Sequence, residues 1–220
     1  LSITMKKTLE HVRQIKDTLQ AVRENNILKM YVDESVLSFM DSKEFETKIT
    51  ANDTIEATVV FFDICGFTTI SENESPDTVV KLLNSYFDVM VQEILEHDGL
   101  VDKFIGDAVM AVFRGDYHLD RAIDAALGVR DKIEELPVFE DEVSYKPKVS
   151  IGIKSGEMVS GNIGSTSLKR LDFTVIGDTV NIAARLQGAA KENQILITED
   201  CYEQIKESFK CNRICLLYTS

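Results

Sequence analysis

The sequence predicts an α+β fold, a ferredoxin-like sandwich with a β-α-β-β-α-β core and an additional C-terminal helix and strand. Three observations support this prediction. Residues 57–62 form an apolar run typical of a strand buried on both faces. Segments at 76–96 and 119–135 have helical periodicity. Apolar stretches that contain glycine lie between these two segments and after the second. With 220 residues and 44% hydrophobic composition, the chain suits one domain with an attached segment.

The first half of the core runs from the strand at 57–62 to a strand pair. Ser75 and Pro76 suit the N-cap and the first position of the first helix. The apolar positions expected on the inner face of that helix are Val80, Leu83, Phe87, Val91 and Ile94. "HDG" at 97–99 ends the helix, and "LVDKFIGDAVMAVF" at 100–113 predicts two strands joined by a tight Gly-Asp turn.

The second half of the core repeats the alternation of helix and strand. The inner face of the helix at 119–135 is expected to consist of Ala122, Ile123, Ala126, Val129 and Ile133. Residues 148–165 are rich in glycine and predict a strand pair, and residues 171–190 predict a strand, a turn and a helix. A last strand is expected at 194–200, followed by a short helix.

A helical stalk is expected before the core. Residues 5–30 are charged, and their apolar residues have heptad-like spacing: Met5, Val12, Ile15, Leu19 and Val22. A dimer stalk and an amphipathic helix packed on its own domain both fit this pattern. The predicted order is stalk, polar linker, core domain and atypical or truncated tail, at 1–40, 41–56, 57–209 and 210–220. Because the chain begins at Leu1, we expect it to be a fragment.

Charge and composition exclude several classes of function. The net charge is −13 and the isoelectric point is about 4.7, so the surface should repel nucleic acids and anionic lipid. No run approaches 18 apolar residues, so no membrane segment is expected. The cysteines, which show no CxxC pair, are Cys65, Cys201, Cys211 and Cys215. They indicate a reducing compartment and hence the cytoplasm, either alone or as part of a membrane-attached protein.

The histidines and cysteines do not favour a hydrolase or a cysteine-bound metal site. His11, His97 and His118 are expected to be solvated on polar helical stretches, which disfavours a Ser-His or Cys-His hydrolase. Cys211 and Cys215 could in principle hold a metal, but no second pair of ligands accompanies them.

Two aspartates end apolar strands where an unpaired carboxylate would be unfavourable. Asp63 follows the strand at 57–62, and Asp107 lies in the turn between two apolar strands. A turn aspartate can simply accept backbone hydrogen bonds. However, adjacent strands lie about 4.8 Å apart, so two carboxylates at their ends repel each other unless a cation lies between them. Oxygen ligands of this kind suit Mg²⁺, which usually keeps waters and adds substrate phosphates.

The turn after Asp63 indicates what the cation would accompany. Gly66 lets the chain turn sharply before a helix, and successive backbone N–H groups in such a turn can bind phosphate oxygens. Beside a metal carboxylate, this pattern favours a nucleoside triphosphate. Neither GxxxxGK[ST] nor GxGxxG occurs, which excludes P-loop and Rossmann sites.

Four stretches, "FFDICGFT", "DKFIGDAVMAVF", "GNIGS" and "DFTVIGDTVNIAARL", resemble in that order the catalytic domain of class III adenylate and guanylate cyclases. The resemblance covers about residues 55–209. It implies that Asp63, Asp107 and the Ile64 backbone bind two divalent ions per active site, Mg²⁺ or Mn²⁺. The residues implied to contact the substrate phosphates are Cys65, Gly66, Phe67 and Thr68.

The resemblance also implies a reaction. The ribose 3′-hydroxyl would attack the α-phosphorus of the same nucleotide in line, closing a 3′,5′-cyclic phosphodiester and releasing pyrophosphate. Asn181 would orient the ribose, and Arg185 would meet the charge that develops in the transition state. These residues are four apart, so one helix face can present both.

The choice of purine is expected to rest on Lys103 and Thr174. In the family, adenylate cyclases carry Lys with Asp or Thr here, whereas guanylate cyclases carry Glu with Cys or a similar residue. Lysine can donate to N1 of adenine and a threonine oxygen can accept from the 6-amino group, whereas guanine has the opposite polarity at both positions. A buried unpaired donor costs about 1–3 kcal/mol, so ATP is favoured over GTP.

Three alternatives stay open on the sequence alone: a guanylate cyclase, a catalytically silent dimerisation module that binds nucleotide, and a palm-type diguanylate cyclase or polymerase. The last lacks a GG[DE]EF-like hairpin. Because family active sites lie between two catalytic domains, the resemblance implies a homodimer with two equivalent sites, regulated by an upstream domain. Many members have Arg at the position of Ser150, where Lys148 or Lys154 could substitute, and "KCNRICLLYTS" replaces the C-terminal hairpin expected in the family.

Overall fold

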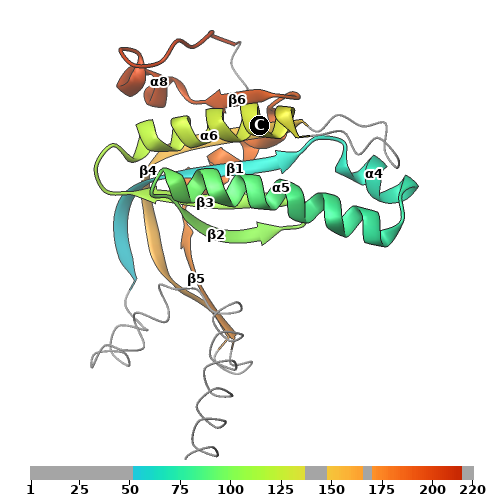
Figure 1. Cartoon of the computed structure of the whole chain (residues 1–220). Coiled ribbons are helices and arrows are strands. Elements are labelled where there is room, and N and C mark those ends of the chain that lie inside the picture. Colours follow the sequence, from blue (N-terminus) through green and yellow to red (C-terminus); the bar gives the residue numbers. More distant parts are fainter. Residues whose placement is uncertain (1–51, 137–147, 166–169, 215–220) are drawn as a thin grey trace, which may run out of the picture. The chain divides into compact units, whose positions relative to one another are not determined.

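The computed structural model describes residues 52–136, 148–165 and 170–214 (Figure 1). The predicted stalk, His11 and Cys215 lie outside these residues. The elements of the compact unit Asn52–Ser220 are, in order, β1 (Asp53–Ile64), α4 (Phe67–Asn73), α5 (Pro76–Glu96), β2 (Leu100–Ile105), β3 (Ala108–Arg114), α6 (His118–Glu135), β4 (Val149–Ser165), β5 (Arg170–Ile176), α7 (Asp178–Ala189), β6 (Gln194–Ile197) and α8 (Glu199–Ile205). Among these residues, no helix combines the length with the apolar composition that a membrane crossing needs.

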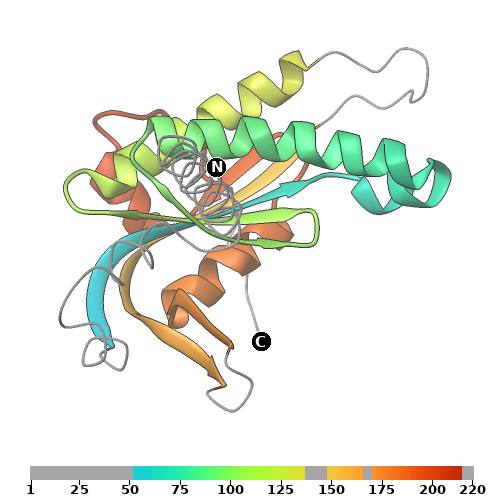
Figure 2. The same ribbon diagram turned by 60° about the horizontal axis from the view of Figure 1, so that its bottom comes forward.

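The sheet confirms the predicted α+β sandwich. Its strands lie in the order β2-β3-β1-β4-β5 with antiparallel neighbours, and β6 pairs in parallel with β4. Helices α5 and α6 cover one face, and α7 covers the other (Figure 2). Because both faces are covered, the central strand β1 is apolar along most of its length, as the run at 57–62 predicted.

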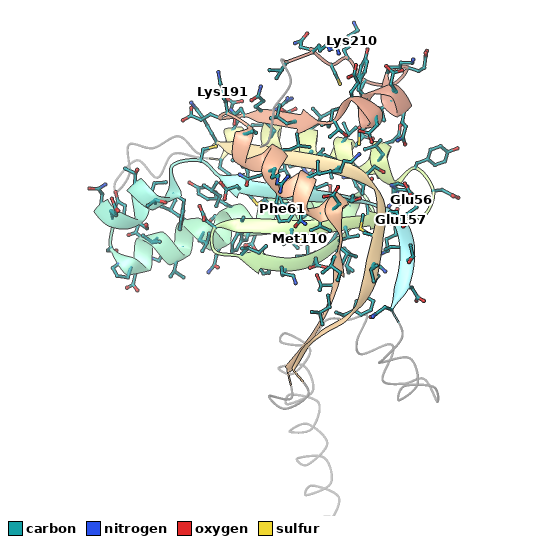
Figure 3. All side chains as sticks on the ribbon, turned by 180° about the vertical axis from the view of Figure 1, so that it is seen from behind. Glu56, Phe61, Met110, Glu157, Lys191 and Lys210 are labelled. Atoms are coloured by element: carbon teal, nitrogen blue, oxygen red, sulfur yellow. The ribbon has the colours of Figure 1, made fainter. Side chains whose placement is uncertain are left out.

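Alternate residues of β1 contribute to two cores. Val60 and Phe62 point toward α5 and α6 and are fully buried there. Val59 and Phe61 point the other way, where Phe61 and Met110 lie on the face beneath α7 (Figure 3). This alternation follows from the period of two in a strand. It places Asp63, the next residue after Phe62, at the end of a strand that the two cores hold from both sides.

Two sequence predictions differ from the structure in strand extent. β1 begins at Asp53, so the predicted linker at 41–56 ends earlier than expected. Residues 53–56, three of which are polar, form strand because they pair with 157–160 of β4, a partner that a local pattern does not reveal. Residues 149–165 form one 17-residue strand instead of a pair, since the glycines of β4 mark close packing and a bend rather than a turn.

Helix α5 begins as predicted, and its buried face is rotated from the predicted one. The Ser75 hydroxyl accepts a hydrogen bond from the Thr78 backbone N–H at 3.2 Å, the arrangement of an N-cap. The buried residues are Thr78, Leu82, Tyr86, Met90, Glu93 and Ile94. Val80 is 56% exposed. Phe87 is partly buried, and its ring centroid is 4.6 Å from that of Phe104 in β2.

The prediction of solvated histidines is wrong for His118, which is half-buried. Helix α6 begins at this residue over β1, so the His118 Nδ1 and the Thr58 Oγ1 form a hydrogen bond of 2.7 Å. Burial lowers the pKa of the His118 imidazole. His97 is also partly buried, and its Nδ1 lies 2.9 Å from the Glu93 carbonyl oxygen at the end of α5. Both histidines are therefore structural.

Candidate active site

The two predicted metal aspartates lie together at one end of the sheet. Asp63 is opposite Ala108 of β3 and Ser150 of β4, and Asp107 directly precedes β3 in the turn that Gly106 makes at φ 64°. The strand register therefore brings the two carboxylates to adjacent strand ends. Their negative charges interact, because Asp107 raises the pKa of Asp63.

The environment of Asp63 fits a bound cation. Burial first, and then the charge of Asp107, raise the pKa of Asp63 to about 6, while a hydrogen bond with Gln187 lowers it. A cation between the carboxylates would remove both unfavourable effects. Within the described residues, no group of three or more Asp, Glu, His or Cys side chains is placed to hold a metal ion, so an ion bound by these two carboxylates would keep positions for water and phosphate oxygens. The donor set thus fits Mg²⁺ or Mn²⁺ shared with a substrate.

Asp63→Asn should stabilise the protein in EDTA at neutral pH. The folded state binds the Asp63 proton more tightly than the unfolded state, whose pKa is 3.8, so unfolding free energy falls as pH rises from about 4 to about 6. Screening at this half-exposed carboxylate reduces the benefit of the variant to about 1–2 kcal/mol at pH 7. Urea unfolding at pH 4 to 7.5 measures it. Asp88→Asn, on the exposed side of α5, is the control. A variant less stable than wild type at pH 7 would contradict the prediction.

The chain turns sharply between β1 and α4. Gly66 has φ 73°, which places it in the left-handed region, and it occupies the N-cap position of α4. The Cys65 backbone N–H donates to the Lys148 carbonyl at 2.9 Å, so this donor is already used within the protein. Burial raises the pKa of the Cys65 thiol. Phosphate contacts of Cys65, Gly66, Phe67 and Thr68 stay a prediction.

Helix α7 carries Asn181, predicted to orient the ribose, and Arg185, predicted to meet transition-state charge, on an exposed face. Its other face is anchored by buried Ala183 and Leu186, and its first turn by a 2.8 Å hydrogen bond from the Thr179 hydroxyl to the Glu157 carbonyl. Asn181 and Arg185 are exposed. In the part of the chain that the structure describes, neither side chain forms a hydrogen bond or an ion pair. The helix therefore presents both side chains on the same exposed face, and their roles toward a substrate stay a prediction.

Gln187 connects α7 to the aspartate end of the sheet. Its Nε2 donates to the Ser150 hydroxyl at 2.9 Å, and its side chain also forms the hydrogen bond with Asp63. Sequence analysis did not single out Gln187. No local signal could have found it, because its role depends on how α7 packs against β4.

The structure brings Lys103 and Thr174 together through a third side chain, the buried carboxylate of Asp102. The Thr174 hydroxyl donates to Asp102 Oδ2 at 2.7 Å, and Lys103 Nζ lies 3.4 Å from the same oxygen. Burial raises the pKa of Asp102, opposed by Thr174, Lys103 and Arg114. Sequence analysis passed over Asp102, although an aspartate inside an apolar strand was the signal that identified Asp63.

The two lysines considered as substitutes for a phosphate-binding arginine differ in position. Lys154 forms an ion pair with Asp200 in α8. Lys148 Nζ lies 2.5 Å from a Glu192 carboxylate oxygen, while its backbone carbonyl accepts from Cys65. Only Lys148 is therefore next to the turn that follows Asp63.

Comparison with known proteins identifies the family of this chain. A family model described as the adenylate and guanylate cyclase catalytic domain matches residues 49–215. The chain belongs to this family. An adenylate cyclase of Anabaena cylindrica is 38% identical over 179 residues, which are 76% of this chain and 34% of that protein. This chain thus spans about a third of that relative's length.

Solved structures show the same cyclase fold. The adenylyl cyclase CyaB from P. aeruginosa has a TM-score of 0.69 and 32% identity, covering 73% of this chain and 85% of that one. The catalytic core of a rhodopsin-guanylyl cyclase with converted specificity, in complex with ATPαS, also has a TM-score of 0.69, with 28% identity over 76% of this chain and 91% of that one. The cyclase fold is therefore found in both adenylyl and guanylyl enzymes.

Proposed function

We propose that this cyclase domain is an adenylate cyclase that converts ATP to 3′,5′-cyclic AMP and pyrophosphate. The observation that carries the proposal is the pairing of Lys103 and Thr174 at one buried carboxylate. An ammonium donor beside a hydroxyl acceptor complements N1 and the 6-amino group of adenine. Guanine would meet Lys103 with an N–H donor of its own, leaving both donors unpaired.

The remaining residues have separate tasks in the proposed reaction. Asp63, Asp107 and the Ile64 carbonyl would hold two divalent ions, Mg²⁺ or Mn²⁺, which supply charge neutralisation for the triphosphate and favour ionisation of a bound hydroxyl. Asn181 orients the ribose so that its 3′-oxygen faces the α-phosphorus in line with the leaving pyrophosphate. Arg185 donates to the phosphoryl oxygens as negative charge builds on them.

We further propose that the active site forms between two copies of the chain. Asn181 and Arg185 are exposed on α7, and among the described residues neither forms a hydrogen bond or an ion pair with Asp63 or Asp107. A symmetric homodimer would supply the aspartates of each site from one copy and the α7 residues from the other. The matched part is 34% of the Anabaena cylindrica relative, and we also propose that an upstream regulatory domain controls this dimer. The cysteine pattern supports the further proposal that catalysis takes place in the cytoplasm.

Product analysis tests the proposed reaction. Purified protein incubated with ATP and Mg²⁺ or Mn²⁺ should form cyclic AMP and pyrophosphate in equal amounts, and far less cyclic GMP from GTP. Asp107→Asn should lower turnover by about 10²–10³-fold, since a loss of several kcal/mol of charge stabilisation is expected. Arg213→Gln, which removes an exposed charge near α8, is the control. Cyclic GMP as the main product would contradict the purine assignment, and no cyclic product at all would contradict the enzyme.

A further inference from the structure

Asp102 links β2 and β5, the first and last strands in the order of the sheet. β2 and β5 have three strands between them in the order of hydrogen-bonded strands, yet the Thr174–Asp102 hydrogen bond joins them. The pairing of β2 with β3 shifts register between Val101 and Lys103, so Asp102 is the extra residue of a bulge. Its side chain is only 2% exposed. The bulge therefore accompanies a buried carboxylate that is within hydrogen-bond distance of Thr174 in β5.

The hydrogen bond to Asp102 fixes the polarity of the Thr174 hydroxyl. A threonine hydroxyl has one proton to donate and two lone pairs that accept, and it rotates to suit its partner. A carboxylate can only accept, so the Thr174 proton points at Asp102 Oδ2. The lone pairs of Thr174 are then all that the hydroxyl can offer to another molecule. Thr174 becomes an acceptor and cannot also be a donor.

Burial raises the pKa of Asp102, and two nearby cations oppose that effect. Lys103 lies 3.4 Å away on one side, and the half-buried Arg114 guanidinium also interacts with the Asp102 charge. Arg114 is itself held by a 3.0 Å hydrogen bond from its Nη2 to the Ser160 hydroxyl and by the ring of Phe173, 5.8 Å from the guanidinium carbon. Two cations beside one buried carboxylate favour the ionised, acceptor-only form.

We propose that Asp102 is a positioning residue that sets purine specificity, by making Thr174 an acceptor that suits the 6-amino group of adenine and repels the 6-oxygen of guanine. The proposal rests on the proposed adenylate cyclase function and deepens it. Without a carboxylate at this position, the Thr174 hydroxyl could rotate and donate to the guanine oxygen. Lys103 and Thr174 together are then insufficient for discrimination, and Asp102 supplies the missing constraint.

The test compares ATP with GTP in Asp102→Asn. An asparagine amide can donate to Thr174, which frees the hydroxyl proton, so the ratio of kcat/KM for ATP over GTP should fall about tenfold, the low end expected for one mismatched hydrogen bond. In a Thr174→Val background, the same Asp102→Asn change should leave the ratio unaltered. Asp124→Asn, exposed on α6, is the matched control with no expected effect. A proportional loss of activity with both nucleotides would assign Asp102 a purely structural role and overturn the proposal.

A second variant and a binding measurement keep the test independent of folding and turnover. Thr174→Ser retains the hydroxyl and should keep the ATP preference, whereas loss of that preference would overturn the proposal even if Asp102→Asn does not fold. Binding of 3′-deoxyATP and 3′-deoxyGTP with Mg²⁺, which lack the attacking hydroxyl, is measured by calorimetry. If wild-type protein makes no cyclic product, the proposed function fails, yet this binding ratio still tests Asp102. Equal binding of both nucleotides by wild type, or binding of neither, would overturn the inference.

Discussion

Mixing the Arg185→Ala and Asp63→Asn variants should restore up to about one quarter of wild-type cyclase activity, although each variant alone should be nearly inactive. Arg185→Ala removes the group proposed to meet transition-state charge, with an expected loss of about 10²–10³-fold in turnover. Asp63→Asn removes a metal carboxylate, with a loss of similar size. Restoration is expected because the two residues belong to different halves of the proposed shared site.

The value of one quarter follows from symmetry. If subunits exchange at random, half of the dimers contain one copy of each variant. In such a dimer one site receives the intact Asp63 of one copy and the intact Arg185 of the other, while the second site receives both substituted residues. Half of the dimers with one active site of two give about a quarter of the full activity.

The matched control combines two substitutions on the same helix. Arg185→Ala mixed with Asn181→Ala should stay inactive, because both residues come from α7 and every site in every dimer lacks one of them. Cyclic AMP is measured after the variants are mixed at concentrations above and below that at which the dimer forms. Activity equal to the sum of the separate variants would contradict a site shared between two chains.

The elements that could be predicted correctly are those whose buried face shows in the local sequence pattern. The apolar run before Asp63 and the inward residues of α6 were identified correctly, since each pattern depends only on which side of an element faces the core. β4 was predicted wrongly as two strands. Glycine signals a turn in a local window, whereas Gly152 is needed because another segment packs against it. Information of that kind lies in the partner helix and cannot be found in β4 itself.

The same distinction applies to the residues of the candidate site: some have a local sequence signal and others depend on packing. Asp63 and Asp107 could be singled out because a charge at the end of an apolar strand requires an explanation wherever it occurs. Asp102 is also a charged residue in an apolar strand, but the adjacent Lys103 offered an ordinary explanation for it. From the sequence, the two residues could simply have formed an ion pair at the surface. Gln187 gives no signal at all, because a glutamine on a helix acquires its role only when the helix is placed on the sheet.

Gly152→Ala should destabilise the protein by about 3 kcal/mol and abolish most of its cyclase activity. A Cβ atom at Gly152 would overlap the backbone of α7, at the Ala183 carbonyl and the Gln187 N–H. Backbone atoms cannot rotate away as a flexible side chain can, so α7 has to move off β4. Gly152 also pairs with Phe61 of β1 and Leu196 of β6, which prevents β4 from yielding instead.

The displacement of α7 should affect activity beyond its effect on stability, because α7 carries Asn181 and Arg185 on its exposed face and holds Asp63 through Gln187. Gly188→Ala is the matched control for stability: this glycine is in α7 with open space around it within the chain, so alanine should stabilise the protein by up to about 1 kcal/mol. Urea unfolding and cyclic AMP formation, measured on both variants at a temperature where Gly152→Ala is still folded, separate the two effects. If the folded Gly152→Ala protein keeps wild-type turnover, the close contact of α7 with β4 is not what positions the catalytic side chains.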